Sequence, residues 1–153
     1  MKTSVVWKDG MEFDGVADDH IVRMDAKKPI GKNAGTSPKE LVAMGLGGCT
    51  AMDVIALLKK YKQPPQAFRV DVEIAPSTGS YPIVFEKAIL TFTIDGAVDS
   101  EKINEAVKLS QTKYCGVSAM LSKAFPIEYR VILNGKEIGT GNARFEFNNK
   151  ELV

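Results

Sequence analysis

The sequence predicts an α+β fold in one domain covering residues 1–153. Short strand-like segments come in blocks, and the helical segments stand between these blocks instead of alternating singly with strands. No internal repeat divides the chain. Its 153 residues, 44% hydrophobic and 25% charged, are typical of one ordinary globular domain that can form a core without disulfides or structural metal.

The N-terminal block is a predicted meander of two or three antiparallel strands within residues 5–24. Asp9-Gly10 lies between β-forming residues and is a strong hairpin signal. Residues 27–35 are rich in Gly, Pro and charge and have no periodicity. We therefore expect them to form a loop that leads into a helix.

A long helix is predicted from Ser37-Pro38 to about Tyr61. Ser37 and Glu40 form a capping box, in which each side chain can bond the backbone amide of the other residue. Pro64-Pro65 ends the helix. Apolar residues surround most of its circumference, so we expect a central helix with little surface facing water.

The rest of the chain alternates between periods of two and of about 3.6 residues, which are typical of strands and amphipathic helices. The predicted elements are strands at 68–74 and 88–94, helices at 100–112 and 116–124, a strand at 127–133 and a tight turn at Asn134-Gly135 into 137–138. This order is α+β and differs from a doubly wound α/β fold.

Charge argues against some classes of partner. Twenty basic and 19 acidic side chains give a formal charge of +1, and the lysines are spread along the chain. We therefore expect no nucleic-acid partner and no anionic membrane partner. We see no uninterrupted apolar run of membrane-spanning length and no apolar segment typical of a signal peptide near Met1, so a cytoplasmic location is expected.

Cys49 and Cys115 are the two cysteines of the chain, and a reducing compartment would keep them as thiols. They are either inert core residues or a redox pair. Gly45, Gly47 and Gly48 precede Cys49 inside the predicted helix, where each costs about 1 kcal/mol relative to Ala. One explanation is that another backbone or a substrate approaches this face of the helix closely. The other is tight packing of two helices, with the small Cys49 side chain filling the contact between them.

Cys115 lies just before or within the first turn of the predicted helix at 116–124. The amides and the positive dipole end there would lower the pKa of its thiol, although Cys115 could also simply lie in the connection between two helices. His20 is the single histidine and by itself makes no metal site. No motif of the sequence calls for a metal or a cofactor.

Three segments together resemble the OsmC/Ohr family, the osmotically inducible and organic hydroperoxide resistance proteins. They are Ser37-Pro38-x-Glu40-Leu41, Gly47-Gly48-Cys49-Thr50-Ala51-Met52-Asp53-Val54 and Tyr114-Cys115-x-Val117-Ser118. The chain is most similar to the OsmC-like branch with a Gly-Gly-Cys-x-Ala-x-Asp motif, over almost its whole length.

This resemblance implies antiparallel sheets packed around long central helices in an intertwined homodimer, with two active sites at the subunit interface. It also implies that Cys49 attacks an organic hydroperoxide and becomes a sulfenic acid, which Cys115 resolves as a disulfide. A dithiol reductant, a lipoylated protein in some members, would reopen the disulfide. Such a resolving thiol protects the sulfenic acid from further oxidation.

The sequence departs from the family's peroxidases at Lys39, where they carry a glutamate that pairs with an arginine. The neighbouring acid, Glu40, is about 180° from Cys49 on a straight helix, which favours its capping role. Asp53, one turn after Cys49, could orient an arginine or be a buried hydrogen-bonding residue. Arg23 is the candidate arginine, with a solvated strand residue as its alternative. An unpaired Asp53 would raise the pKa of the Cys49 thiol.

We therefore expect a thiol peroxidase with Cys49 and Cys115 as its reactive thiols and Arg23, Glu40 and Asp53 as further candidate site residues. One alternative is a non-enzymatic OsmC-like protein that binds an apolar or thiol ligand in the dimer-interface cleft. Another is a domain whose central helices serve dimerisation alone.

Overall fold

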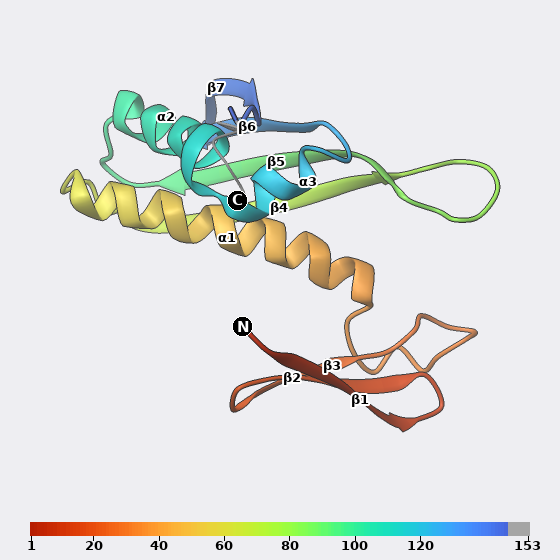
Figure 1. Ribbon diagram of the computed structural model, residues 1–153. Coiled ribbons are helices and arrows are strands. Elements are labelled where there is room, and N and C mark those ends of the chain that lie inside the picture. The colour runs from red at the N-terminus through yellow and green to blue at the C-terminus, as the bar shows by residue number, and fades with distance from the viewer. Residues whose placement is uncertain (147–153) are drawn as a thin grey trace, which may run out of the picture. The chain divides into compact units, whose positions relative to one another are not determined.

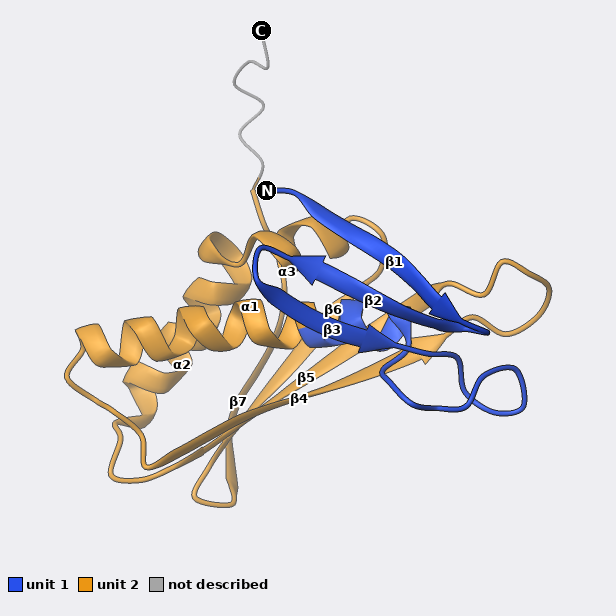
Figure 2. Cartoon of the chain, turned by 90° about the horizontal axis from the view of Figure 1, so that it is seen from below, with its two compact units in different colours: residues 1–44 blue, residues 45–153 orange. Residues whose placement is uncertain are grey.

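The computed structural model describes residues 1–146, and the chain divides into two compact units, residues 1–44 and 45–153 (Figure 2). Helices and strands occur in the blocks that the sequence predicts, so the α+β class is confirmed. The single domain expected over residues 1–153 stays a prediction.

The first unit contains a three-stranded antiparallel sheet in the order β1-β2-β3. Its strands are β1 (Thr3–Asp9), β2 (Glu12–Ala17) and β3 (His20–Met24). The chain turns at Gly10 and at Asp18, which both have positive φ. The predicted meander is therefore confirmed, and its hairpin register pairs Trp7 with Phe13 and Gly15 with Val22.

A buried carboxylate organises the loop after β3. Asp25 accepts hydrogen bonds from the backbone amides of Ala26, Lys32 and Ala34 at 2.7, 2.9 and 2.9 Å. These bonds satisfy polar backbone groups in a segment with no helix or strand of its own, and they lower the pKa of Asp25. The predicted loop is confirmed, and it ends at the start of the long helix.

The long helix α1 (Pro38–Lys60) is shown in Figure 1. It begins with the predicted capping box. The amide of Ser37 donates to Glu40 Oε2 at 2.8 Å, and the amide of Glu40 donates to Ser37 Oγ at 3.4 Å. Lys62 then adopts a left-handed conformation just after the last turn. The helix therefore ends close to the predicted Tyr61.

Burial of α1 differs from the prediction. Its buried residues form one stripe, consisting of Leu46, Gly47, Thr50, Val54 and Leu58. Outside the stripe, Val42, Met44 and Met52 are exposed in the single chain. The helix is therefore buried along one side rather than around most of its circumference, because one chain supplies packing partners for one side.

Hydropathy sets α1 apart from the other helices of the described residues. An 18-residue window has a mean hydropathy of 1.9, enough in length and composition for a membrane span, although the sequence analysis found no such run. Within the structure, 28% of this window is buried. Core helices of globular proteins have the same properties, so length and composition alone do not make α1 a membrane span.

The second unit contains a four-stranded sheet in the order β4-β5-β6-β7. Its strands are β4 (Ala67–Pro76), β5 (Phe85–Asp95), β6 (Ile127–Leu133) and β7 (Lys136–Asn142). The sheet is mixed. The β4–β5 and β6–β7 pairs are antiparallel, as expected, whereas β5 and β6 run parallel. A parallel pair needs a long crossover, and the helices between these strands provide it.

The crossover contains three consecutive helical segments. They are α2 (Ser100–Leu109), the π-helix η1 (Ser110–Tyr114) and α3 (Gly116–Leu121). Asp99 caps α2 by accepting from the amides of Glu101 and Lys102. The sequence analysis predicted one helix through residue 112, whereas the structure changes from α to π geometry at Ser110.

One hydrophobic core joins α1, α2 and the sheet. The buried residues of β5 alternate along the strand, as the period of two predicts. The core residues include Leu46, Val54 and Leu58 of α1, Ile103, Ala106 and Val107 of α2, Ala88, Leu90, Phe92 and Ile94 of β5, and Ile127 and Val131 of β6. This packing fixes α1 against α2 and the sheet.

Gly47 and Gly48 of α1 provide a matched test of this packing. A Cβ at Gly47 would lie 2.8 Å from Val72 Cγ2, whereas a Cβ at Gly48 would have no neighbour within 4 Å. Ala is favoured over Gly in a helix by about 1 kcal/mol at both positions, but overpacking at Gly47 costs about 1–3 kcal/mol. We expect Gly47→Ala to have a lower free energy of unfolding in urea than Gly48→Ala. Equal values would contradict the close approach of Val72.

Candidate functional site

The structure brings the two cysteines together. The Sγ atoms of Cys49 and Cys115 and a carboxylate oxygen of Asp53 all lie within 4.8 Å of one another. Both cysteines are free thiols in this arrangement. The 66 positions that separate them in the sequence are bridged where Thr50 and Asp53 of α1 form hydrogen bonds with Ser110 of η1.

Cys49 and Asp53 owe their common face to α1. Residues four apart in an α-helix lie one turn above each other, so both side chains point toward the same neighbour. Cys49 and Asp53 are each half-buried. The glycines before Cys49 have different surroundings, because Gly47 packs on a side chain of β4 while Gly45 and Gly48 face open space in the single chain.

Cys115 lies where η1 ends and α3 begins. Its amide donates to the Ser110 carbonyl at 3.0 Å, and its Sγ accepts from the amide of Ser118 at 3.3 Å, as an N-cap residue does. The π-helix is the rarer, wider helical form and often occurs at functional sites. Here it carries the chain from α2 to the buried position of Cys115.

The pKa of Cys115 contradicts the prediction that a helix start would lower it. Burial raises the pKa of this thiol to about 11, with hydrogen bonds from Ser118 acting in the opposite direction and Cys49 adding to the increase. The side chain is fully buried, and α3 has six residues. Desolvation of the thiolate therefore outweighs the stabilisation offered by the helix start.

Asp53 belongs to a chain of buried polar side chains that sequence analysis missed. Gln111 Nε2 donates to Thr50 Oγ1 at 2.7 Å, Thr50 and Ser110 share a hydrogen bond of 2.7 Å, and Ser110 Oγ donates to Asp53 Oδ2 at 3.1 Å. Burial raises the pKa of Asp53, and the Ser110 bond partly offsets this. The signal for this chain that the sequence did contain is the spacing of Thr50 and Asp53, two polar residues three positions apart on one predicted helix.

Arg23 and Glu40 have their described partners within the first unit. Arg23 Nε lies 3.8 Å from Asp14 Oδ1 across the β2–β3 pair. Glu40 accepts from Ser37 and pairs with Lys27 Nζ at 2.7 Å, and these contacts lower its pKa to about 2. The capping role of Glu40 is confirmed. A role of either residue toward Cys49 stays a prediction.

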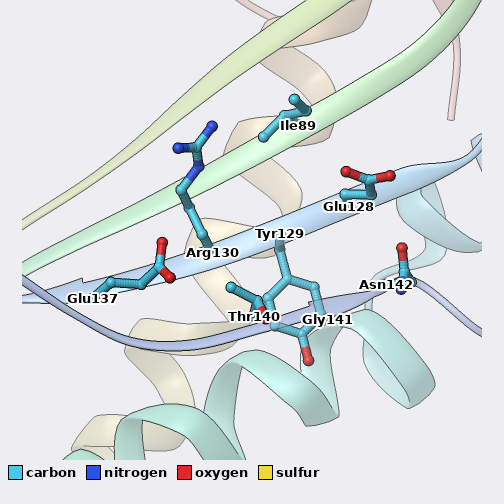
Figure 3. Close-up of a pocket in the computed structure, with 8 residues that line it drawn as sticks. All are labelled: Ile89, Glu128, Tyr129, Arg130, Glu137, Thr140, Gly141 and Asn142. Atoms are coloured by element: carbon cyan, nitrogen blue, oxygen red, sulfur yellow. The ribbon is translucent and has the colours of Figure 1, made fainter.

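A shallow cavity of about 300 Å³ borders the cysteine–aspartate cluster. Asp53, Ala56, Leu57 and Tyr114 line it, so the carboxylate contributes to its wall. A second cavity, of about 340 Å³, lies over β6 and β7 and is lined by charged and polar side chains that include Glu128, Arg130 and Glu137 (Figure 3). Of the described residues that line these two cavities, none is a cysteine, and Asp53 is the residue that connects the first cavity to the two thiols.

The Thr50–Ser110 contact can be tested by removing one hydroxyl. We expect Thr50→Val to lower the free energy of unfolding by about 1–3 kcal/mol, because Gln111 and Ser110 lose a buried partner. Chemical denaturation measures this change. Thr93→Val on β5 is the matched control, since Thr93 is half-buried and outside the chain of hydrogen bonds. Equal effects at the two sites would contradict the network.

Comparison with known proteins agrees with this geometry. The family model described as OsmC-like protein matches residues 31–130, which include both cysteines and Asp53. Protein YhfA of Escherichia coli K12 is 35% identical over 134 residues, covering 84% of this chain and 95% of YhfA. This is a similarity over nearly the whole length of that protein.

Two solved structures share the fold at low sequence identity. The OsmC-like protein from Mycoplasma pneumoniae has a TM-score of 0.76 at 16% identity, covering 86% of this chain and 95% of its own. An organic hydroperoxide resistance protein OsmC from Legionella pneumophila has a TM-score of 0.66 at 15% identity, with coverages of 86% and 97%. The family match over residues 31–130 and the similarity to YhfA establish that the chain belongs to the OsmC-like protein family.

Proposed function

We propose that this protein is a cysteine-based peroxidase that reduces organic hydroperoxides. The observation that carries the proposal is the pair of free thiols within 4.8 Å, one half-buried and one fully buried. The names of the structural neighbours, which include organic hydroperoxide resistance proteins, point to the same chemistry.

Burial supports different roles for the two thiols. Cys49 is the more accessible sulfur, so it meets the peroxide. Its thiolate attacks the outer oxygen of R–O–O–H, the O–O bond breaks, and Cys49 becomes a sulfenic acid while the alkoxide takes up a proton and leaves as the alcohol. The raised pKa of Cys115 suits a residue that waits as a thiol.

Cys115 then resolves the oxidised Cys49. Its sulfur attacks the sulfenic sulfur, the S–S bond forms, the S–O bond breaks, and water leaves with the thiol proton. A dithiol reductant, by thiol–disulfide exchange, returns both cysteines to thiols and is itself oxidised to a disulfide. The two sulfurs need to move closer by about 2.8 Å at most, given a disulfide bond of about 2 Å.

Asp53 is the reason for proposing a positively charged partner. A carboxylate oxygen of Asp53 lies within 4.8 Å of Cys49 Sγ, and a nearby cation would balance this negative charge at the reacting sulfur. Arg23 is the side chain that we assign to this role. Lys39, which stands where the family's peroxidases have an acid, leaves Glu40 as the capping residue and removes the usual acidic partner of that arginine.

Exposed apolar surface supports the homodimer. In the first unit, Val5, Trp7 and Ile21 are exposed on the three-stranded sheet, and Met44 and Met52 are exposed on α1. Gly45 and Gly48 leave room for close approach of another backbone. Such surface is normally covered by a partner. The two free thiols suit a reducing compartment such as the cytoplasm.

The two cysteines serve as controls for each other in the activity test. Stopped-flow mixing of the reduced chain with cumene hydroperoxide should consume peroxide faster than mixing with hydrogen peroxide. We expect Cys49→Ser to abolish consumption. Cys115→Ser should consume peroxide without forming an intramolecular disulfide, and mass spectrometry should find Cys49 over-oxidised. Slow reaction of the wild type would favour a binding protein instead.

Arg23 has a matched control in Arg69. Each arginine pairs with an aspartate on a strand. Arg23 Nε lies 3.8 Å from Asp14 Oδ1, and Arg69 Nε lies 2.9 Å from Asp71 Oδ2. We expect Arg23→Gln to slow sulfenic acid formation by about tenfold or more, because a charged hydrogen bond contributes about 1.5–3 kcal/mol. Arg69→Gln should leave the rate unchanged. A wild-type rate in Arg23→Gln would exclude this role for Arg23.

A further inference from the structure

The cysteine–aspartate cluster has the donor atoms of a zinc site. Two thiol sulfurs and one carboxylate oxygen lie within 4.8 Å of one another. In tetrahedral coordination, Zn–S bonds of about 2.3 Å and Zn–O bonds of about 2.1 Å place the ligand atoms roughly 3.5–3.8 Å apart. A contraction of about 1.3 Å at most would therefore bring these atoms onto one ion.

The elements that carry the donors are suited to holding an ion. Cys49 and Asp53 are four residues apart on α1, the spacing at which a helix directs two ligands to one metal. Cys115 approaches from the junction of η1 and α3, where its amide is bonded to Ser110. Two ligands from a rigid helix and one from a separate element make a site with fixed geometry.

Hydrogen bonds already orient two of the three donors. Ser110 Oγ holds Asp53 Oδ2, which leaves the other carboxylate oxygen available as a ligand. The amide of Ser118 donates to Cys115 Sγ. Partners of this kind fix the direction of metal ligands and tune their affinity. The described hydrogen-bond partners of Asp53 and Cys115 are neutral groups. A bound cation would therefore supply the positive charge that balances the carboxylate and the thiolate.

The shallow cavity next to Asp53 is the side from which an ion and a water ligand would reach the three donors. It has a volume of about 300 Å³ and is lined by Asp53, Ala56, Leu57 and Tyr114. A water molecule there would complete a tetrahedron with three protein ligands. Thiolate donors select zinc over magnesium or calcium, which prefer oxygen donors alone.

We propose that Cys49, Asp53 and Cys115 together bind one zinc-class divalent cation, with a fourth position open to the neighbouring cavity. Binding converts both thiols to thiolates and releases their two protons to solvent, with no change of oxidation state. The consequence for regulation rests on the proposed function. Because the ion occupies both reactive sulfurs, it would exclude hydroperoxide and keep the enzyme reduced and inactive.

Equilibrium dialysis of the reduced full chain against Zn²⁺ tests the site without any peroxide. We expect one ion per chain, no binding in Cys49→Ser or Cys115→Ser, and binding weaker by about tenfold or more in Asp53→Asn. Asp71→Asn, at a half-buried aspartate of β4 that pairs with Arg69, is the matched control and should bind as the wild type does. Wild-type affinity in Asp53→Asn, or no bound zinc in the wild type, would overturn the proposal.

Two measurements on the unaltered chain do not depend on how the variants fold. Co²⁺ should give the visible bands of a tetrahedral site and a thiolate charge-transfer band, and Zn²⁺ should slow alkylation of Cys49 while Mg²⁺ does not. Octahedral spectra or unprotected Cys49 would contradict the site. A chain that binds zinc but leaves hydroperoxide unreacted would refute the peroxidase alone, and one that reduces hydroperoxide but binds no zinc would refute the cation site alone.

Discussion

The contact between α1 and the π-helix η1 is the constraint on which the rest of the site depends. Thr50 and Ser110 share a buried hydrogen bond of 2.7 Å, and each also bonds a further side chain, Gln111 and Asp53. Thr50, Ser110 and Gln111 are fully buried, and an unpaired hydroxyl in such surroundings costs about 1–3 kcal/mol. The network therefore fixes how α1 and η1 meet, and that alignment determines the distance between the two sulfurs.

Burial divides the chemistry between the two thiols. Cys115 is covered on all sides and its pKa is raised, whereas Cys49 is half-buried near a cavity that Asp53 lines. An oxidant from solvent therefore meets Cys49 first. The same closeness of two sulfurs and a carboxylate suits both disulfide formation and capture of a zinc-class ion, so both proposals use one geometry.

Part of the apolar surface of β1 and α1 is left uncovered in the single chain. The strand β1 is exposed along its whole length although it carries Val5, Val6 and Trp7, and α1 leaves an apolar side uncovered. Burial of this surface by a second copy would also explain why α1 has glycines that face open space in one chain. Apolar residues around a helix thus indicate more packing partners than a single chain contains.

The sequence by itself determined the local elements of this protein. The capping box of Ser37 and Glu40, the hairpin at Gly10 and the alternation along β5 each depend on neighbouring residues, so their patterns predicted structure correctly. The spacing of Cys49 and Asp53 also predicted that their side chains share one face of a helix, because residues one helix turn apart keep this relation in any α-helix. Sequence could also place Thr50 on the same helix face as Asp53, but it could not supply the partners of Thr50.

Tertiary structure decided the features that depend on residues far apart in the chain. The parallel pairing of β5 with β6, the π geometry at Ser110 and the hydrogen bonds from Gln111 to Asp53 all arise where α2 and η1 pack against the sheet and α1. The pKa of Cys115 was predicted with the wrong sign for the same reason. A helix start is visible in sequence, but desolvation depends on what covers the thiol, and packing between distant segments alone determines that.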